Sequence, residues 1–577
     1  MILPSGPAPI ALPASTAKSL LRDLPIIVGG LALFYGLLAL SHYWTAPVNS
    51  QANIQLSPFV LPKYALFSVA RILTAYLISL VFAISYGQFA AHNLRAERLL
   101  IPLLDTLQSI PVLSFLPPVM VAMVALFPTR QLGVELGSIL LIFTGQVWNM
   151  AFSVYSSTKN IPRELMEAAD VYRLSWWQRF TQLELPCAAI GLVWNSMMSV
   201  AGGWFFLMAC EAFVLNKRDL RLPGLGSYLQ TAANAGDTGA VLWGLAAMIA
   251  VIVLMDQAIW RPIIAWGEKF KLEQVEASHT PRSPILTMFR RSRLVHAMTH
   301  KAIDPALEAV DLYFARRPGA HSTQERRRGL RWIVSTFAAL GLTLLLYAVV
   351  KMSLMLAQLT RPELAQIFLG AGATFLRVEF TLLLAGLWTV PVGVYIGLRP
   401  RLAAIAQPIA QVAASVPATA LFPIVLLVLI RVGGGLGVGS ILLLLLGTQW
   451  YILFNVIAGA SAIPTDLKEV CDIYQMTRRE RWQKLYLPAI FPYLITGFVT
   501  ASGGAWNASI VAEYSTIKGQ TYSTVGLGAV ISSATVAGNF AVLLGATVVM
   551  AATVVTVNRL FWRRMYGLAS TRYKLEG

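Results

Sequence analysis

The sequence predicts an all-α integral membrane protein built from two repeated halves. Of its 577 residues, 56% are hydrophobic and only 12% are charged, which is far more apolar than a soluble domain. Apolar runs near the ~20 residues that cross the hydrocarbon core recur along the chain. One segment also occurs twice, because EAADVYRLSWWQRFTQLELP at 167–186 returns as EVCDIYQMTRRERWQKLYLP at 469–488. Such a long repeat indicates two equivalent halves around a shared axis.

Each half is expected to cross the membrane six times, which gives about 12 spans. Lipid offers the backbone no hydrogen-bond partners, so apolar runs of this length are helices that tolerate internal Pro and Gly. In the first half the runs are 24–44, 65–91, 110–127, 136–155, 189–214 and 240–260. In the second half they are 331–357, 370–397, 411–430, 438–459, 490–512 and 540–562. We therefore expect one membrane unit at 1–262 and another at 329–577.

The two units are joined by a basic segment at 263–328, in which hydrophobicity falls and arginines accumulate. Within it, the pattern at 304–317 predicts a helix with Asp304 as N-cap and Pro305 at its first position. A loosely apolar side and a basic C-terminal end favour a helix at the membrane surface that leads into the next span. A disordered charged linker is the alternative for this composition.

The net charge of +18 is explained by membrane topology rather than by nucleic-acid binding. Basic residues concentrate in short segments between or after the spans, as in loops on the cytoplasmic side. This pattern places both termini, the basic linker and both copies of the repeated segment in the cytoplasm. The run 24–44 directly follows Lys18 and Arg22, which favours a retained first span over a cleaved signal peptide. The exceptions on the outer side are Lys217, Arg218 and Arg221.

We expect neither a disulfide framework nor a metal site. The three cysteines, Cys187, Cys210 and Cys471, form no close pair in the sequence. His296 and His300 have a helical spacing that metal ligands use. However, Ala297 replaces the glutamate of the H-E-x-x-H motif and the surroundings are basic, so solvated histidines are favoured.

The repeated segment predicts two short helices joined by a turn. The tetrapeptides at 175–178 and 477–480 both fit the S/T-x-x-E/Q capping box, which starts a helix by satisfying its first amide groups. Aromatic residues follow in both copies, which suits docking into a groove of another protein or anchoring at the lipid interface. These residues are Trp176, Trp177 and Phe180 in one copy and Trp482 and Tyr486 in the other.

At these residues the chain resembles the permease subunits of binding-protein-dependent ABC importers. The repeated segment is similar to their cytoplasmic coupling segment, in which E-A-A, three residues and a Gly precede a helix that ends in Leu-Pro. The stretches SVARILTAYLISLVFAISYG, SIPVLSFLPP and LPGLGSYLQTAANAGD are similar to nitrate/sulfonate/taurine-type permeases, and FLRVEFTLLLAGLWTVPVGV, SVPATALFPI and STVGLGAVISSATVAGN match them in the second half. The resemblance covers 60–270 and 366–570. It implies two fused six-helix type I ABC importer domains with pseudo-two-fold symmetry in a bacterial inner membrane.

The resemblance implies an ATPase-docking role for both coupling segments. This sequence departs from the family where the coupling-loop glycine would stand, and it has Val and Cys for the two alanines of the second copy. The two copies therefore need not bind their partners equally. A residue with a Cβ pays a steric cost at positive φ, so we expect the capping boxes to carry the turn instead. The residues concerned are Glu167, Ala168, Ala169, Asp170, Arg173 and Ser175, and Glu469, Val470, Cys471, Asp472, Gln475 and Thr477.

The implied function is solute import driven by ATP hydrolysis on other subunits. An ABC ATPase dimer that binds ATP and Mg would push the coupling segments and switch a central cavity between outward- and inward-facing states. The sequence has no G-x-x-x-x-G-K-[ST] phosphate loop, so we expect two separate ATPase subunits, no cofactor bound by this chain and no covalent catalysis. An external or periplasmic binding protein would deliver a small anionic solute such as nitrate, a sulfonate, taurine or bicarbonate.

Two other functions remain open from the sequence. A secondary transporter can also contain internal repeats with sites near the membrane midplane. It would often carry ionisable residues at mid-span, and these are scarce here. A membrane anchor for ATPases that does not itself transport is the second alternative.

Polar and aromatic residues within the spans are candidates for the translocation path. Most of them occupy corresponding positions in the two halves. For each of them, helix packing and interhelical hydrogen bonding is the alternative role. The candidates are Ser109, Gln146, Asn149 and Trp204 in the first half, and Ser415, Thr448, Gln449 and Trp506 in the second.

Two arginines lie below the expected outer surface, Arg71 in one half and Arg377 in the other. Glu211 and Glu513 stand at corresponding depths near the outer ends of the fifth spans. An unpaired charge at this depth is costly, so we expect Arg71–Glu211 and Arg377–Glu513 ion pairs that brace an outer gate. The alternative is that both arginines contact an anionic solute, because a guanidinium suits planar oxyanions.

Overall fold

The computed structural model describes residues 54–215, 218–270, 297–315, 346–432, 435–517 and 520–572, with short stretches inside 23–44, 286–292 and 339–343. The described part is helical apart from loops and two short antiparallel hairpins, which confirms the predicted all-α membrane fold. The hairpins, which the sequence patterns did not predict, pair β1 with β2 and β3 with β4.

From residue 54 on, the first half has a single 3₁₀ turn at Pro58–Val60 and continues as a chain of helices. Its elements are α2 (Leu61–His92), α3 (Leu94–Ser109), α4 (Leu116–Leu126), α5 (Leu132–Lys159), α6 (Arg163–Val171), α7 (Trp176–Arg179), α8 (Leu185–Glu211), β1 (Val214–Leu215), β2 (Arg218–Asp219), α9 (Leu225–Ala235), α10 (Thr238–Met255) and α11 (Arg261–Gly267).

The second half repeats this order element by element. Its elements are α16 (Arg361–Gly397), α17 (Pro400–Ser415), α18 (Ala418–Arg431), α19 (Leu436–Ser461), α20 (Thr465–Ile473), α21 (Arg478–Arg481), α22 (Leu487–Ala512), β3 (Tyr514–Ile517), β4 (Gln520–Ser523), α23 (Leu527–Ala537), α24 (Phe540–Val557) and α25 (Arg563–Arg572).

Two π-helical turns also repeat at equivalent places in the halves. Phe180–Glu184 and Trp482–Tyr486 join the short cytoplasmic helix to the long span, and Asp256–Trp260 and Asn558–Trp562 end the last span. In the described residues, eight helices are long and apolar enough to cross a membrane, which matches eight of the twelve predicted spans. The predicted spans 24–44 and 331–357 are described only in part. Their described residues are helical up to Leu356, and Leu346–Leu356 forms a short apolar helix.

The predicted span 411–430 is wrong as a single continuous helix, because α17 ends and α18 begins within it. The predicted span 110–127 corresponds to a continuous helical segment at Val112–Leu126, which follows a sharp bend. In the first half, α3 and α4 are separated by a break at which the chain bends by 87°. Ile110 is extended (φ −82°, ψ 130°) because the ring of Pro111 disfavours a helical conformation in the residue before it. Val416 (φ −74°, ψ 115°) precedes Pro417 in the same way between α17 and α18.

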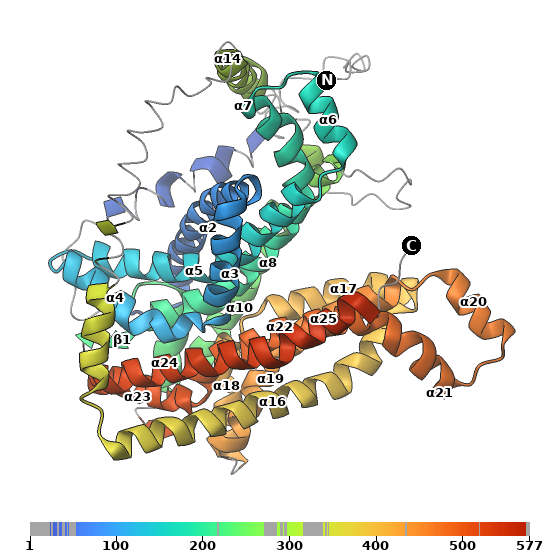
Figure 1. Cartoon of the computed structure of the whole chain (residues 1–577). Helices are drawn as coiled ribbons and strands as arrows, with labels where there is room; N and C mark the ends of the chain where they lie inside the picture. The colour runs from blue at the N-terminus through green and yellow to red at the C-terminus, as the bar shows by residue number, and fades with distance from the viewer. Residues whose placement is uncertain are drawn as a thin grey trace.

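The linker contains the expected helix, α14 (Asp304–Ala315). The prediction that Asp304 is its N-cap is wrong, because Asp304 is itself helical (φ −61°, ψ −46°) and continues a π-helical turn at Thr299–Ile303. His300 Nδ1 lies 2.8 Å from an Asp304 carboxylate oxygen along this helix. The helix packs against α7 of the first half, as Figure 1 shows at the top of the molecule.

Within each half, three long helices form the core. In the first half α5 packs between α2 and α8, and in the second half α19 packs between α16 and α22. Between the halves, α18 contacts α8 and α9, and α9 contacts β3. The α6–α7 and α20–α21 segments lie away from this junction, one at the top and one at the right of Figure 1.

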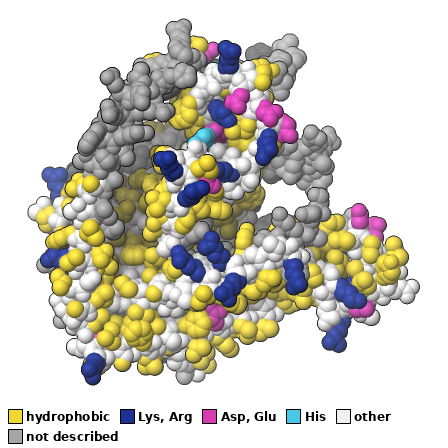
Figure 2. All heavy atoms as spheres, in the orientation of Figure 1, with side chains coloured by type: hydrophobic (Ala, Val, Ile, Leu, Met, Phe, Trp, Pro, Cys, Tyr) yellow, Lys and Arg dark blue, Asp and Glu magenta, His cyan; other side chains and the backbone are white. Residues whose placement is uncertain are grey.

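Apolar side chains cover much of the face shown in Figure 2. Acidic side chains gather over α6 and α20, at the two ends of the molecule that lie away from the junction of the halves (Figure 2). One of the basic residues on the predicted outer side is neutralised locally, since the guanidinium of Arg221 holds the carboxylate of Asp219. These hydrogen bonds outweigh the effect of partial burial and lower the pKa of Asp219.

Candidate functional site

Each repeated segment forms a helix, a sharp turn and a second helix. In the first copy α6 ends in a Schellman motif, in which the Leu174 amide donates to the Ala169 carbonyl (3.0 Å) and the Arg173 amide donates to the Asp170 carbonyl (3.1 Å). In the second copy the Met476 amide donates to Cys471 (3.0 Å) at the end of α20 in the same way. The same backbone turn is therefore built twice from different sequences.

Arg173 and Gln475 adopt the left-handed conformation, with φ of 51° and 47°. The expectation that capping boxes would carry the turn instead of these residues is therefore wrong in part. The backbone keeps the shape that glycine would supply, although a residue with a Cβ pays a steric cost of about 1–2 kcal/mol there. The capping boxes are present as well, two residues later, at Ser175 and Thr477.

An ion pair ties the two short helices of each copy together. Arg179 Nη1 lies 3.1 Å from Asp170 Oδ1 in the first copy, and Arg481 Nη1 lies 2.7 Å from Asp472 Oδ1 in the second. These arginines stand one position after the capping boxes end. The turn is thus fixed by backbone hydrogen bonds, by a capping box and by a surface ion pair.

Both segments carry the predicted docking carboxylates, Glu167 and Glu469, on their solvent-exposed surface. A pair of apolar residues that the sequence analysis did not single out is exposed beside them. Val171 and Tyr172 are 79% and 70% exposed, and Ile473 and Tyr474 are 77% and 73% exposed. We call these four residues the coupling knobs. The sequence could have indicated them, because an aliphatic residue followed by Tyr stands directly before the turn residue in both copies.

The remaining coupling residues divide between the interior and the surface. Ala169 and Cys471 are buried, which explains why this position needs a small side chain. Trp176 is exposed, as are Tyr172 and Tyr474 of the coupling knobs, whereas the remaining aromatics of the two segments are half-buried. Those half-buried residues are Trp177, Phe180, Trp482 and Tyr486.

The predicted Arg71–Glu211 pair is present and is part of a larger cluster. Arg71 Nη1 lies 2.7 Å from Glu211 Oε1, and both side chains are fully buried. Glu135, which the sequence analysis missed, binds the same guanidinium in a bidentate manner, with both N–O distances at 2.7 Å. Two carboxylates therefore surround one arginine, a geometry that gives strong charge-assisted hydrogen bonds.

The predicted Arg377–Glu513 pair is also present, but its surroundings differ. The position equivalent to Glu135 is Gly437, so Arg377 has one carboxylate partner among the described residues. Its guanidinium also donates to two neutral acceptors, the Thr524 hydroxyl (3.4 Å) and the Val525 carbonyl (3.1 Å). The side chain of Arg377 is 11% exposed, whereas that of Arg71 is fully buried.

The carboxylates of Glu211 and Glu513 also accept hydrogen bonds from the Gly-Leu-Gly sequence that occurs in both halves. Glu211 Oε2 accepts from the Gly226 amide (2.7 Å) and Glu513 Oε2 accepts from the Gly528 amide (2.8 Å). A carboxylate thus caps the start of α9 and of α23, where amide groups and the helix dipole favour negative charge. A Cβ on Gly224 would lie 2.2 Å from the Glu211 carboxyl carbon, so only glycine fits there.

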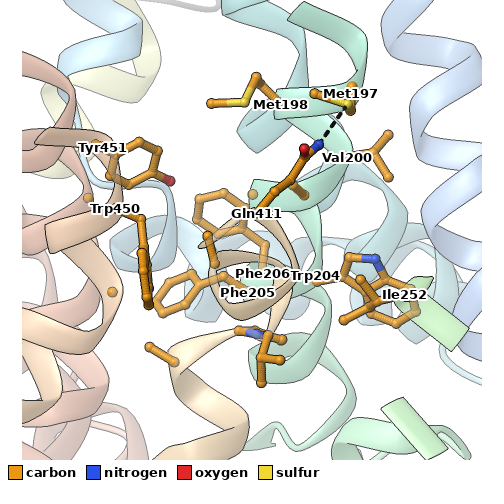
Figure 3. Close-up of a pocket in the computed structure, with 18 of the residues that line it drawn as sticks. Met197, Met198, Val200, Trp204, Phe205, Phe206, Ile252, Gln411, Trp450 and Tyr451 are labelled. Atoms are coloured by element: carbon orange, nitrogen blue, oxygen red, sulfur yellow. Dashed lines mark hydrogen bonds between the residues drawn. The ribbon is translucent and has the colours of Figure 1, made fainter. Parts of the chain in front are cut away.

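A cavity of about 180 Å³ lies between the two halves. Its walls come from α8, α10 and the following π-helical turn of the first half, and from α17, α18, α19 and α22 of the second. In Figure 3, Trp450 and Tyr451 lie on one side, Trp204 and Ile252 on the other, and Phe205, Phe206 and Gln411 between them. The amide of Gln411 lies 3.6 Å from the Met197 sulfur across the halves.

Of the eight path candidates, the structure places Trp204 in the wall of this cavity. Thr448 donates to the Leu444 carbonyl of its own helix, and Asn149 accepts from Gln108 (3.0 Å). The side chains of Ser109 and Ser415 lie outside the described set. The others, Gln146, Gln449 and Trp506, are not in the wall.

Gln146 is fully buried, and neither atom of its amide has a hydrogen-bond partner among the described residues. Hydrogen bonding between helices of the described part therefore does not explain why a glutamine is buried at this position. The cavity residues that the sequence analysis passed over include Phe205, Phe206, Gln411 and Trp450. Their aromatic composition was visible, but which of them face the junction depends on how the two halves meet.

Comparison with known proteins agrees with the repeat. The family model described as "Binding-protein-dependent transport system inner membrane component" matches residues 77–258 and again 389–569, which is more than half of the chain. The matched segments include both coupling segments and most of the cavity wall.

Several curated proteins are similar to parts of the chain. The nitrate import permease protein NrtB of Leptolyngbya laminosa is 29% identical over 147 residues, which is 26% of this chain and 51% of that protein. The bicarbonate transport system permease protein CmpB of Synechococcus elongatus is 30% identical over 141 residues, 24% of this chain and 49% of that protein. The glycine betaine transport system permease protein OpuAB of Bacillus subtilis is 24% identical over 220 residues, 37% of this chain and 73% of that protein.

The chain thus spans about half the length of the first two relatives. The family match, by contrast, occurs once in each half, over the same elements in the same order. The chain therefore belongs to the family of inner-membrane components of binding-protein-dependent transport systems, and it carries the membrane domain of that family twice.

Proposed function

We propose that this chain supplies both membrane domains of an ATP-driven importer and moves a small anionic solute inward by alternating access. Two ABC ATPase subunits, which carry ATP and Mg, would bind the two coupling segments on the cytoplasmic side. An external or periplasmic binding protein would deliver the solute to the opposite face. Both termini would then lie in the cytoplasm of a cell with this chain in its inner membrane.

The observation that carries the proposal is the twofold presence of one exposed docking element. Each copy presents a carboxylate and a coupling knob on a turn that is fixed by hydrogen bonds, a capping box and an ion pair. Exposed aromatic and aliphatic residues on a rigid element are typical of docking anchors. Lipid anchoring does not explain the acidic residues that surround both knobs, which are Glu164, Glu167 and Asp170 in one copy and Asp466, Glu469 and Asp472 in the other.

The solute class rests on the relatives. Two of them are named for nitrate and bicarbonate, which are small anions. The buried arginines support a structural role instead of the alternative in which they contact solute, because Arg71 is saturated by two carboxylates and neither arginine lines the central cavity. We therefore assign Arg71–Glu211 and Arg377–Glu513 to bracing the outer ends of the spans.

The test is ATP-dependent uptake into liposomes that contain this chain with its ATPases and binding protein. We expect the double variant Tyr172→Ala/Tyr474→Ala to lose ATPase binding, because truncation of an interface anchor costs about 2 kcal/mol or more, or roughly 30-fold in affinity per site. Uptake should fall with it. Tyr566→Ala is the matched control, since Tyr566 is an exposed tyrosine on α25 outside both segments.

Other outcomes would contradict the proposal. Uptake that continues without any ATPase would identify a secondary transporter. If ATPases bind to the chain but their ATP hydrolysis neither responds to solute nor drives uptake, the chain is an anchor. Unchanged ATPase binding in the double variant would show that the coupling knobs are not the docking surface.

A further inference from the structure

A groove of about 590 Å³ opens on the surface of the second half, where its lining comes from α16 and α19. Two charged side chains, Arg377 and Glu379, line it. Apolar side chains form most of the remaining wall, and those on α16 are exposed. These apolar residues are Leu376, Phe380, Leu383 and Ile441.

The Arg377 guanidinium retains donor groups beside this groove. In the first half, the Glu135 carboxylate accepts from both Nε and Nη2 of Arg71. In the second half Gly437 replaces that glutamate, and Nη2 of Arg377 donates only to neutral oxygen atoms. Nε of Arg377 makes no hydrogen bond with the described residues. The first half therefore shows where an anionic group fits on this guanidinium, and the second half offers no carboxylate of its own there.

Glu379 brings a negative charge to the same groove. Its Oε1 atom is buried and has no hydrogen-bond partner in the described part of the chain. A buried carboxylate oxygen that lacks a donor is costly, so this position favours a ligand that donates hydrogen bonds. The equivalent residue of the first half is Leu73, so this second charge is particular to the groove.

The groove lies at one surface of the membrane, opposite to the coupling segments. Ser461, the last residue of α19, donates to the carbonyl of Gly397 at the end of α16 (3.1 Å), and α20 follows directly. Arg377 precedes Gly397 by about 20 residues, which is about 30 Å of helix. This length equals the thickness of the hydrocarbon core. Arg377 therefore stands where the lipid headgroups of the opposite leaflet begin.

These features fit one class of membrane lipid. The phosphate of a phospholipid supplies the negative charge and the acceptor oxygens that suit a guanidinium. The ammonium of an ethanolamine headgroup supplies the positive charge and the N–H donors that suit Glu379. A purely anionic headgroup would be repelled by Glu379, and a choline headgroup has no N–H to donate. The exposed apolar side chains of α16 would contact the acyl chains.

We propose that the groove binds one ethanolamine phospholipid, with its phosphate on Arg377 in the place that Glu135 takes on Arg71, and its ammonium group at Glu379. The lipid completes the shell of Arg377 as Glu135 completes that of Arg71. This inference depends neither on the transport function proposed above nor on the identity of the solute.

Native mass spectrometry of the purified full-length chain tests the proposal. The delipidated protein in detergent is titrated with phosphatidylethanolamine, phosphatidylglycerol and phosphatidylcholine that have identical acyl chains. We expect phosphatidylethanolamine to occupy one site with higher affinity than the other two lipids, and inorganic phosphate to leave it bound. Equal affinities for the three lipids would indicate unspecific contact and overturn the proposal. Displacement of the lipid by inorganic phosphate would overturn it as well, because the site would then belong to a soluble anion.

The variant Gly437→Glu places a carboxylate where the lipid phosphate is proposed to bind. It should weaken the affinity for phosphatidylethanolamine about 10- to 100-fold, since a hydrogen bond to a charged group contributes about 1.5–3 kcal/mol. Gly372→Glu is the matched control, because Gly372 is an exposed glycine of α16 outside the groove, with no atom within 4 Å of an added Cβ. Unchanged affinity in Gly437→Glu, or an equal loss in Gly372→Glu, would contradict the phosphate position.

A second variant tests the headgroup without touching the phosphate position. Glu379→Gln should still bind phospholipid but should lose the preference for phosphatidylethanolamine over phosphatidylglycerol, because the repulsion of the anionic headgroup and the attraction of the ammonium group both disappear. A preference that persists in Glu379→Gln would show that the ammonium group does not contact this residue, and the ethanolamine assignment would be wrong.

Discussion

The two arginine clusters differ by one carboxylate, and that difference sets the cost of removing another. Arg71 contacts both Glu135 and Glu211, so loss of Glu211 leaves a neutral buried pair. Arg377 contacts Glu513 alone among the described carboxylates, so its loss leaves a largely buried positive charge. We predict that Glu513→Gln destabilises the protein by about 3–5 kcal/mol. Glu211→Gln should cost clearly less, as measured by thermal unfolding in detergent.

A rescue experiment separates this charge effect from general damage. A Cβ on Gly437 has no atom nearer than 3.9 Å, so a side chain fits at the position that is equivalent to Glu135. We predict that Gly437→Glu restores much of the stability lost in Glu513→Gln, because it supplies Arg377 with the partner that Arg71 already has. A double variant as unstable as the single one would contradict this interpretation.

The turn residues allow another prediction at the residue level. Arg173 and Gln475 have a left-handed backbone conformation that is strained for a residue with a Cβ and that glycine adopts without strain. We predict that Arg173→Gly raises the free energy of unfolding by up to about 1 kcal/mol and leaves ATPase binding intact. Arg173→Val should lower it, because a β-branched residue is strained there. Loss of ATPase binding in Arg173→Gly would instead show that the side chain itself contacts the ATPase.

At the level of elements, the capping boxes are testable in isolation from the rest of the fold. Ser175 accepts from the Gln178 amide (3.3 Å) and Thr477 accepts from the Glu480 amide (3.4 Å), which starts α7 and α21. We predict that Ser175→Ala costs about 0.5–2 kcal/mol locally. Amide hydrogen exchange should accelerate at 176–179 and stay unchanged at 478–481. Equal protection in wild type and variant would argue that packing alone holds α7.

The elements also show what the sequence could predict. The capping boxes at Ser175 and Thr477 were predicted at the correct residues, because four residues are enough to specify a cap. The breaks before Pro111 and Pro417 had a local signal too, but the surrounding apolar run hid it. The hairpins after Glu211 and Glu513 had none, since such short strands are determined by packing beside α9 and α23.

At the scale of the whole molecule, the repeat predicted the two halves but not how they meet. The Arg–Glu pairs were predictable because both partners lie within one half and at matching depths. The cavity wall was not, because Trp450 and Phe205 become neighbours only through the junction of the halves. The repeat shows that Gly437 occupies the position equivalent to Glu135. That Arg377 therefore lacks a second carboxylate partner could be inferred only from the position of Arg377 in the structure.

The separated coupling segments predict the motion that transport would require. α6–α7 and α20–α21 lie away from the junction of the halves, so an ATPase dimer that closes on ATP would draw them together (Figure 1). Spin labels at Val171→Cys and Ile473→Cys, with Cys187, Cys210 and Cys471 replaced by alanine, report this distance. We predict that ATP shortens it when both ATPases are bound, whereas a pair at Ile473→Cys and Leu560→Cys within one half stays constant. An unchanged first distance, or equal changes in both pairs, would rule out rigid closure of the two halves as the coupling step.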